Sequence, residues 1–142
     1  MPRVLLLTAV ALCATVAHAQ SGMASVQAFF DENGPREGDG ALTVVGPVLA
    51  DYAETGDATE SLALEAGVEY MIVIVTPDGQ GLDPDVYVYD AAMDMVASGI
   101  EVAERELLFF TPEEGGSYTI EFSVLGDGAA LPYGYAIYRP DD

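Results

Sequence analysis

Hydrophobic and polar residues alternate along most of the chain after residue 41, in short runs that turn-forming residues separate. The clearest run covers residues 117–124, where aromatic or aliphatic side chains occupy every even position and Ser, Thr or Glu every odd one. Strict alternation over roughly four to eight residues is typical of a strand with one buried face. Residues 68–75 are instead almost continuously apolar, which predicts a strand in the centre of a sheet.

The runs predict about eight strands and no convincing helix. Short strands with turn residues between them favour a sandwich or a barrel, and β-branched and aromatic residues suit a pleated, packed surface. We therefore predict an all-β protein, built as a single antiparallel, jelly-roll-like β-sandwich. The predicted strands are 42–45 continued by 48–52, 61–66, 68–75, 85–90, 93–97, 106–110, 117–124 and 133–138.

Residues 20–41 differ in composition from the sandwich predicted for residues 42–142, and we interpret them as an acidic, Gly-rich approach segment. Within this segment, residues 31–40 combine acidic residues with Gly and Pro, which indicates turns. The preceding residues 26–30 form a short apolar patch. This patch fits either a first strand or a short helix packed on the edge of the domain, and the pattern leaves both open.

Residues 1–19 have the features of a secretory signal peptide. Arg3 supplies a positive charge, residues 4–16 are apolar apart from two threonines, and Ala17-His18-Ala19 is a small-x-small cleavage site. The apolar run is shorter than the roughly 20 residues that cross a bilayer as a helix, which disfavours the alternative of an uncleaved anchor. We expect cleavage after Ala19, a secreted or periplasmic protein, and no membrane insertion afterwards.

The charge balance excludes nucleic acid as a partner. Asp and Glu number 24 against four arginines, which gives a net charge of −20, whereas binding a polyanion needs a basic surface. The acids are spread over nearly every loop and form no long block. We interpret them as a solvated surface, as in proteins from salty habitats, more than as a field that attracts a basic partner.

The predicted cleavage also removes most catalytic chemistry. Cys13 and His18 are the one cysteine and the one histidine, and the sequence has no lysine. Ser-His-Asp and Cys-His catalysis, lysine Schiff bases and zinc sites built on His or Cys would all lack their residues. A carboxylate pair of the glycosidase type is the enzyme design that remains. We therefore predict that the protein is not an enzyme, with no catalytic residues and no required cofactor.

Four aspartates are the candidate ligands for a calcium ion: Asp78, Asp83, Asp85 and Asp90. Calcium takes oxygen ligands, which clustered loop carboxylates and backbone carbonyls can supply. Strand alternation places Asp85 and Asp90 on opposite faces, however, and the spacing lacks the Asp-x-Asp-x-Asp-Gly pattern of a calcium loop. The competing interpretation is that these aspartates cap turns and solvate strand ends.

Tyrosines at alternate positions could present an aromatic surface. Tyr87 and Tyr89 share one face of a strand, and Tyr133 and Tyr135 share one face of another. If such a pair is exposed, it forms a platform for a glycan or a peptide. We favour the other interpretation, in which these rings and Tyr138 fill the interior of the sandwich.

Five motifs, taken in order, carry a family resemblance: Leu64-Glu65-Ala66-Gly67-Val68-Glu69-Tyr70, Asp83-Pro84-Asp85-Val86-Tyr87-Val88-Tyr89-Asp90, Met95-Val96-Ala97-Ser98, Phe110-Thr111-Pro112-Glu113-Glu114-Gly115-Gly116-Ser117-Tyr118-Thr119-Ile120 and Tyr133-Gly134-Tyr135-Ala136-Ile137-Tyr138. Residues 42–138 resemble the bacterial pre-peptidase C-terminal domain family. The resemblance implies a small β-sandwich of a kind usually attached to secreted proteases, and some members of the family bind calcium.

Two features depart from the family pattern. Pro84 stands where the family usually has an aliphatic residue. Because proline has no N–H to donate to a sheet ladder, we predict that the strand starts at Asp85 and leaves Asp83 in the preceding loop. The 142 residues also contain no protease domain, so the role of an accessory to a catalytic neighbour on the same chain does not carry over directly.

Three hypotheses for function follow. The leading one is a secreted, non-catalytic accessory or binding module whose partner is a secreted enzyme, a surface protein or an extracellular polymer. The second is a calcium-dependent structural or adhesion module, and the third is a carboxylate-based hydrolase. The sequence identifies neither the ligand nor the oligomeric state.

Overall fold

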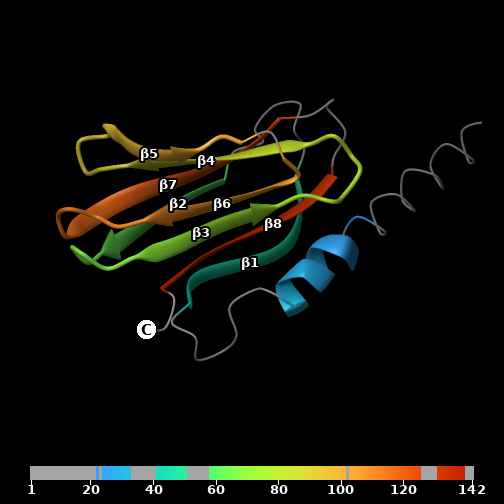
Figure 1. Ribbon diagram of the computed structural model, residues 1–142, viewed down its shortest axis with the longest axis horizontal. Coiled ribbons are helices and arrows are strands. Elements are labelled where there is room, and N and C mark those ends of the chain that lie inside the picture. Colours follow the sequence, from blue (N-terminus) through green and yellow to red (C-terminus); the bar gives the residue numbers. More distant parts are fainter. Residues whose placement is uncertain are drawn as a thin grey trace, which may run out of the picture.

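The computed structural model describes residues 22, 24–32, 41–50, 58–101, 103–125 and 131–139, which include eight strands and one short helix over residues 24–32 (Figure 1). The predicted signal peptide and residues 33–40 of the approach segment lie outside the described residues. The strands are β1 (Ala41–Ala50), β2 (Ala58–Leu64), β3 (Tyr70–Val75), β4 (Asp83–Tyr89), β5 (Met95–Gly99), β6 (Arg105–Phe110), β7 (Gly116–Leu125) and β8 (Leu131–Tyr138).

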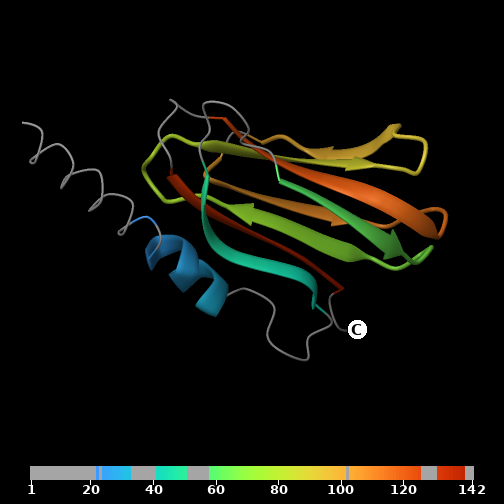
Figure 2. The same ribbon diagram turned by 180° about the vertical axis from the view of Figure 1, so that it is seen from behind.

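The strands form two antiparallel sheets of four that face each other (Figures 1 and 2). The first, called the β3 sheet below, has the order β1-β8-β3-β6, and the second, called the β4 sheet, has the order β2-β7-β4-β5. Consecutive strands alternate between the sheets except for the β4–β5 hairpin. This is the strand order of a jelly roll, so the predicted fold class is confirmed. A register shift between Val45 and Val48 matches the interruption predicted in the first strand.

The core lies between the sheets and is filled by alternate residues of each strand. On β7 the predicted alternation is observed, with Tyr118, Ile120, Phe122 and Val124 buried. The ring of Phe122 stacks on that of Tyr135 from β8, with ring centroids 4.2 Å apart, so the two sheets are joined by aromatic contact. Burying one side chain of this size contributes about 2–3 kcal/mol to the free energy of unfolding.

The helix packs on the outer surface of the β3 sheet. Val26 is fully buried, and Phe29 and Phe30 pack against Val73 and Val75, whose side chains point away from the core. Strand β3 is therefore covered on both faces, which explains why its sequence is continuously apolar. Of the two structures that the sequence left open for residues 26–30, the helix is the one observed. No helix within the described ranges is long and apolar enough to cross a membrane.

The predicted start of β4 is wrong by two residues. The strand begins at Asp83, and both Asp83 and Pro84 pair with β7. Pairing with β5 begins only at Val86, so β4 has a single neighbouring strand at Pro84. A strand with one neighbour can accommodate a proline at a position whose N–H would face away from that neighbour.

Candidate functional site

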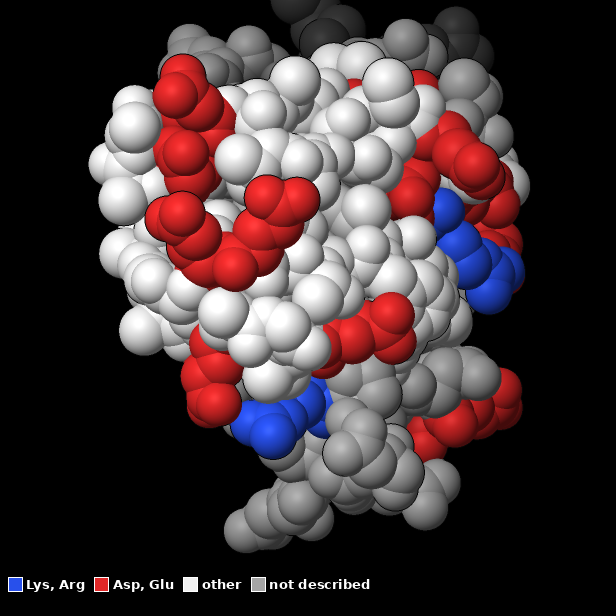
Figure 3. All heavy atoms as spheres, turned by 60° about the vertical axis from the view of Figure 1, so that its left-hand side comes forward, with Lys and Arg blue, Asp and Glu red and all other residues white. Residues whose placement is uncertain are grey.

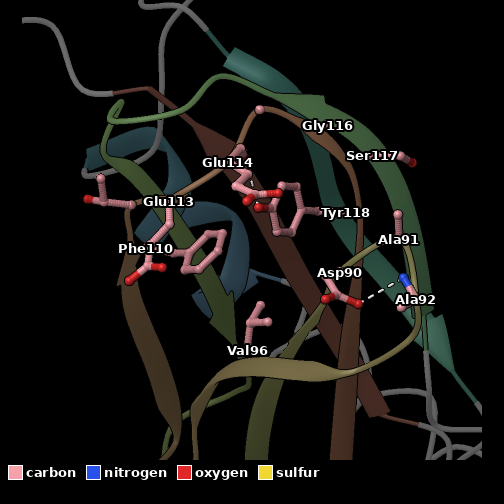
Figure 4. A pocket seen from close by; sticks show the side chains of 12 residues that line it. Asp90, Ala91, Ala92, Val96, Phe110, Glu113, Glu114, Gly116, Ser117 and Tyr118 are labelled. Carbon is pink, nitrogen blue, oxygen red and sulfur yellow. Dashed lines mark hydrogen bonds between the residues drawn. The ribbon is translucent and has the colours of Figure 1, made fainter.

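A pocket of about 730 Å³ opens at one end of the sandwich, between the β4–β5 turn and the β6–β7 loop (Figure 4). Its volume lies within the range of roughly 300–1,000 Å³ that is usual for small-molecule sites. We call it the end pocket. Its lining residues are Asp90, Ala91, Ala92, Val96, Phe110, Thr111, Glu113, Glu114, Gly115, Gly116, Ser117 and Tyr118.

Asp90 builds the turn on one side of the end pocket. Its Oδ1 atom accepts hydrogen bonds from the backbone N–H groups of Ala92 and Asp94, each at 2.9 Å. Two backbone hydrogen bonds close the same turn, from the N–H of Asp90 to the carbonyl of Asp94 and from the N–H of Met93 to the carbonyl of Asp90. Met93 has a positive φ of 65°, a backbone geometry found mainly in turns. This is the turn-capping role that the sequence allowed for Asp90.

The β6–β7 loop on the other side is held at both of its ends. The Tyr118 hydroxyl donates to the backbone carbonyl of Glu114 at 2.8 Å, and the Gly67 N–H donates to the carbonyl of Pro112 at 2.8 Å. The rings of Phe110 and Tyr118 meet edge to face with centroids 5.5 Å apart. Figure 4 shows these two rings close together beneath the loop. The pocket is therefore fixed by the fold before any ligand arrives.

The end pocket combines carboxylates with apolar surface. Glu113 and Glu114 are exposed, Asp90 is half-buried, and Val96 and the two rings supply apolar atoms. No basic residue occurs among the described residues that line it. Figure 3, which brings this side of the molecule forward, shows Asp and Glu gathered in several groups around uncharged surface. The electrostatic potential of such a site attracts positively charged groups.

The four aspartates predicted as calcium ligands do not come together. Asp78 lies in the β3–β4 loop, exposed and 3.7 Å from Arg105, whereas Asp90 lies beyond the other end of β4. Strand β4, which is seven residues long, lies between the two positions and spans about 20 Å. Asp85 is buried and accepts a hydrogen bond from the Tyr87 hydroxyl, and the Oδ1 atom of Asp83 is buried without a hydrogen-bond partner among the described residues.

Within the described part of the chain, no three His, Cys, Asp or Glu residues form a group that could hold a metal ion. Calcium binding therefore stays a prediction, and the structure gives it no shared site built from Asp78, Asp83, Asp85 and Asp90.

The tyrosine pairs behave differently from each other. Tyr133 and Tyr135 are buried in the core, as predicted. Tyr87 and Tyr89 instead lie half-buried on the outer face of the β4 sheet, because the inward positions of β4 belong to Val86 and Val88. Tyr138 is also half-buried, and it packs on the outer side of the β3 sheet. The prediction that all these rings fill the interior is therefore wrong for the β4 pair and for Tyr138.

Glu106 is a buried carboxylate that sequence reasoning did not single out. It lies on β6 with 6% of its surface exposed, against Gly99 of β5, where a Cβ atom would meet its side chain at 2.6 Å. Its Oε2 atom accepts a hydrogen bond from the Glu101 N–H at 3.1 Å. Burial raises the pKa of Glu106 above the ordinary value, and the negative charges of Glu101 and Asp85 act in the same direction.

Comparisons with known proteins identify the fold and no family. No family model matches the chain, and no curated protein matches it. Among solved structures, the chain is similar to the pre-peptidase C-terminal domain of a collagenase from Bacillus anthracis, with 10% identity and a TM-score of 0.50, over 66% of this chain and 89% of that one.

A second similar structure is PliG, a periplasmic inhibitor of g-type lysozyme from Aeromonas hydrophila, with 14% identity and a TM-score of 0.48 over 73% of this chain and 90% of that one. The likeness to the collagenase domain, at 10% identity, shows a shared fold alone. The strand order establishes the jelly-roll sandwich, while membership of the pre-peptidase C-terminal family stays a prediction.

Proposed function

We propose that this chain is a non-catalytic β-sandwich binding module that acts outside the cytoplasm and holds a cationic group of its partner in the end pocket. The observation that carries the proposal is a preformed cavity of about 730 Å³ with carboxylates at its rim and aromatic rings at its base. The extracytoplasmic location rests on the signal peptide expected at residues 1–19.

The chemistry of the lining fits an arginine or lysine side chain better than a small anion or a neutral hydrocarbon. Such a side chain has an apolar stem and a charged head. Val96, Phe110 and Tyr118 can contact the stem, and Glu113 and Glu114 can pair with the head. A secreted enzyme or surface protein with an exposed basic residue is therefore the class of partner we propose.

The same residues give little support to catalysis. Asp90 has one carboxylate oxygen engaged by two backbone N–H groups, and Glu113 and Glu114 are exposed to water. A glycosidase needs one carboxylic acid whose environment keeps it protonated opposite a second, ionised one. If purified protein hydrolysed a glycoside and Asp85→Asn abolished that activity, the proposal of a non-catalytic module would fail.

Titration calorimetry with hexaarginine at low ionic strength, where charges are weakly screened, tests the pocket. We expect Glu113→Gln with Glu114→Gln to weaken binding by about fivefold, because the pair contributes roughly 1 kcal/mol. The matched control is Asp31→Asn with Glu32→Gln, two exposed residues of the helix, which makes the same change in net charge. Equal weakening in both double variants would show that the peptide responds to overall charge and would reject the end pocket as its site.

A further inference from the structure

The outer surface of the β4 sheet carries a band of hydroxyl groups, most of them exposed. The helix packs on the other sheet (Figure 2), and no described helix or strand lies over this one. Strand alternation and register place these polar side chains outside while their neighbours fill the core. The hydroxyl-bearing residues of this surface are Thr59, Ser61, Ser98, Ser117, Thr119 and Ser123.

Two aromatic rings lie in the middle of this band. Tyr87 and Tyr89 are two residues apart on β4, which puts their Cα atoms about 7 Å from each other along the strand. Tyr87 stands opposite Ser98 on β5, and Tyr89 stands opposite Thr119 on β7. Both rings are half-buried, so each keeps part of its surface in solvent. The two rings and the hydroxyl residues around them are called the tyrosine face below.

Carboxylates border the rings and fix one of them. The Tyr87 hydroxyl donates to Oδ2 of Asp85 at 3.0 Å, and Glu121 stands opposite Tyr87 on β7. Burial and the hydrogen bond to Asp85 raise the pKa of Tyr87 above its ordinary value, so the hydroxyl stays protonated at neutral pH. An ordered ring of this kind loses little conformational entropy when a ligand stacks on it.

We propose that the tyrosine face is a second binding site, which takes a neutral glycan chain lying across Tyr87 and Tyr89. A pyranose ring has an apolar C–H face and a rim of hydroxyl groups. The tyrosine rings match the apolar face, and the serine and threonine hydroxyls can both donate to and accept from the rim. Carboxylates such as Glu121 accept hydrogen bonds from sugar hydroxyls, and a charged acceptor makes the stronger bond.

The charge on this face selects against acidic glycans. Sulfate and carboxylate groups are usually recognised by arginine or lysine, and neither residue occurs among the described residues of the tyrosine face. Asp85 and Glu121 would repel an anionic chain. A basic peptide would need only hydrogen-bond acceptors such as carboxylates. The many hydroxyl side chains, which can also donate, therefore favour a sugar.

The test measures binding of residues 20–142, the chain expected after cleavage, to an array that carries neutral, sialylated and sulfated glycans. We expect retention on neutral glycans and none on the acidic ones. Tyr87→Ala and Tyr89→Ala should each weaken the retained interaction by up to about tenfold, which is the loss expected for one aromatic stacking contact. Tyr138→Ala is the matched control, since Tyr138 is a half-buried tyrosine on the other sheet.

Further variants separate this site from folding effects and from the end pocket. Tyr87→Phe keeps the ring and removes the hydrogen bond to Asp85, so it should retain most of the glycan binding even if Tyr87→Ala loses stability. Glu113→Gln with Glu114→Gln should bind glycans like the unmodified chain. The proposal is overturned if no neutral glycan is retained, if Tyr87→Ala and Tyr89→Ala bind as well as Tyr138→Ala, or if the face retains hexaarginine in place of sugars.

Discussion

The Tyr118 hydroxyl donates a hydrogen bond to the backbone carbonyl of Glu114 at 2.8 Å and so ties the β6–β7 loop to the strand beneath it. Tyr118 itself is buried in the core of the sandwich. Tyr118 therefore has two roles. Its ring packs in the core, and its hydroxyl holds the loop that forms one side of the end pocket.

Tyr118→Phe removes that bond and keeps the ring. We expect a loss of about 1 kcal/mol in the free energy of unfolding, a fall in Tm of about 4 °C, and weaker binding of hexaarginine because the loop is released. Thermal unfolding and titration calorimetry measure the two effects. The control is Tyr138→Phe. The Tyr138 hydroxyl contacts only the Sδ atom of Met71, at 3.4 Å, among the hydrogen bonds described for it, so this variant should change Tm and binding much less. Unchanged binding in Tyr118→Phe would mean that the hydrogen bond does not hold the pocket.

Glu106 predicts a pH dependence of stability. Its pKa is raised in the fold by burial, from an ordinary value of 4.5, so above about pH 4.5 the unfolded chain ionises this group more readily than the folded one. Stability from this group is thus present at low pH and is lost as the pH rises through the folded pKa. Glu106→Gln keeps the volume against Gly99 and an acceptor for the Glu101 N–H.

Glu106→Gln should therefore raise Tm at pH 7.5 and leave it nearly unchanged at pH 4. Melting curves across that range measure the difference between the two proteins. Glu69→Gln, at an exposed position, controls for the loss of one negative charge from an acidic protein. If Glu106→Gln lowered Tm at pH 7.5, the ionised Glu106 carboxylate would stabilise the folded state, which would contradict this prediction.

Gly134 of β8 lies where the helix packs tightly on the β3 sheet. A Cβ atom at this position would lie 2.6 Å from Phe30 and 3.0 Å from Val26, so Gly134→Ala should push the helix away from β8. Overpacking of this kind costs about 1–3 kcal/mol. Denaturant unfolding measures the loss, and limited proteolysis within residues 24–32 reports release of the helix. Gly116→Ala is the control, because its Cβ would meet no atom within 4 Å; equal stability of the two variants would contradict the tight packing.

Much of the fold can be read from alternation, because each strand of a sandwich has one face in the core. Residues 117–124 show this pattern without exception, and they form β7 as predicted. The helix was ambiguous because residues 26–30 are too few to distinguish a period of 3.6 from a period of two. Its effect was nevertheless visible in the sequence, since the apolar run of β3 indicates a strand covered on both faces.

The same spacing did not distinguish exposed tyrosines from buried ones. On β4 the signal lay in Asp85, which shares a face with Tyr87 and Tyr89 and so marks that face as the outer one. On β8 the intervening residues Gly134 and Ala136 are small, because the helix packs there, and the tyrosines take the inward positions. The end pocket could not be predicted, since it joins two turns that are distant in sequence and meet only when the sheets stack.

Calcium binding is tested most sharply at Asp83, whose Oδ1 atom is buried without a partner among the described residues. Because Asp83 begins β4 and Asp90 follows its other end, no calcium ion can use both. We therefore expect that any rise in Tm with calcium is lost in Asp83→Asn and kept in Asp90→Asn. Calcium at about 100 times its Kd would add about 2.7 kcal/mol to the free energy of unfolding, or about 10 °C in Tm. Identical melting curves in calcium and in chelator would rule out calcium binding, and loss of the effect in both variants would contradict the separation of the two carboxylates.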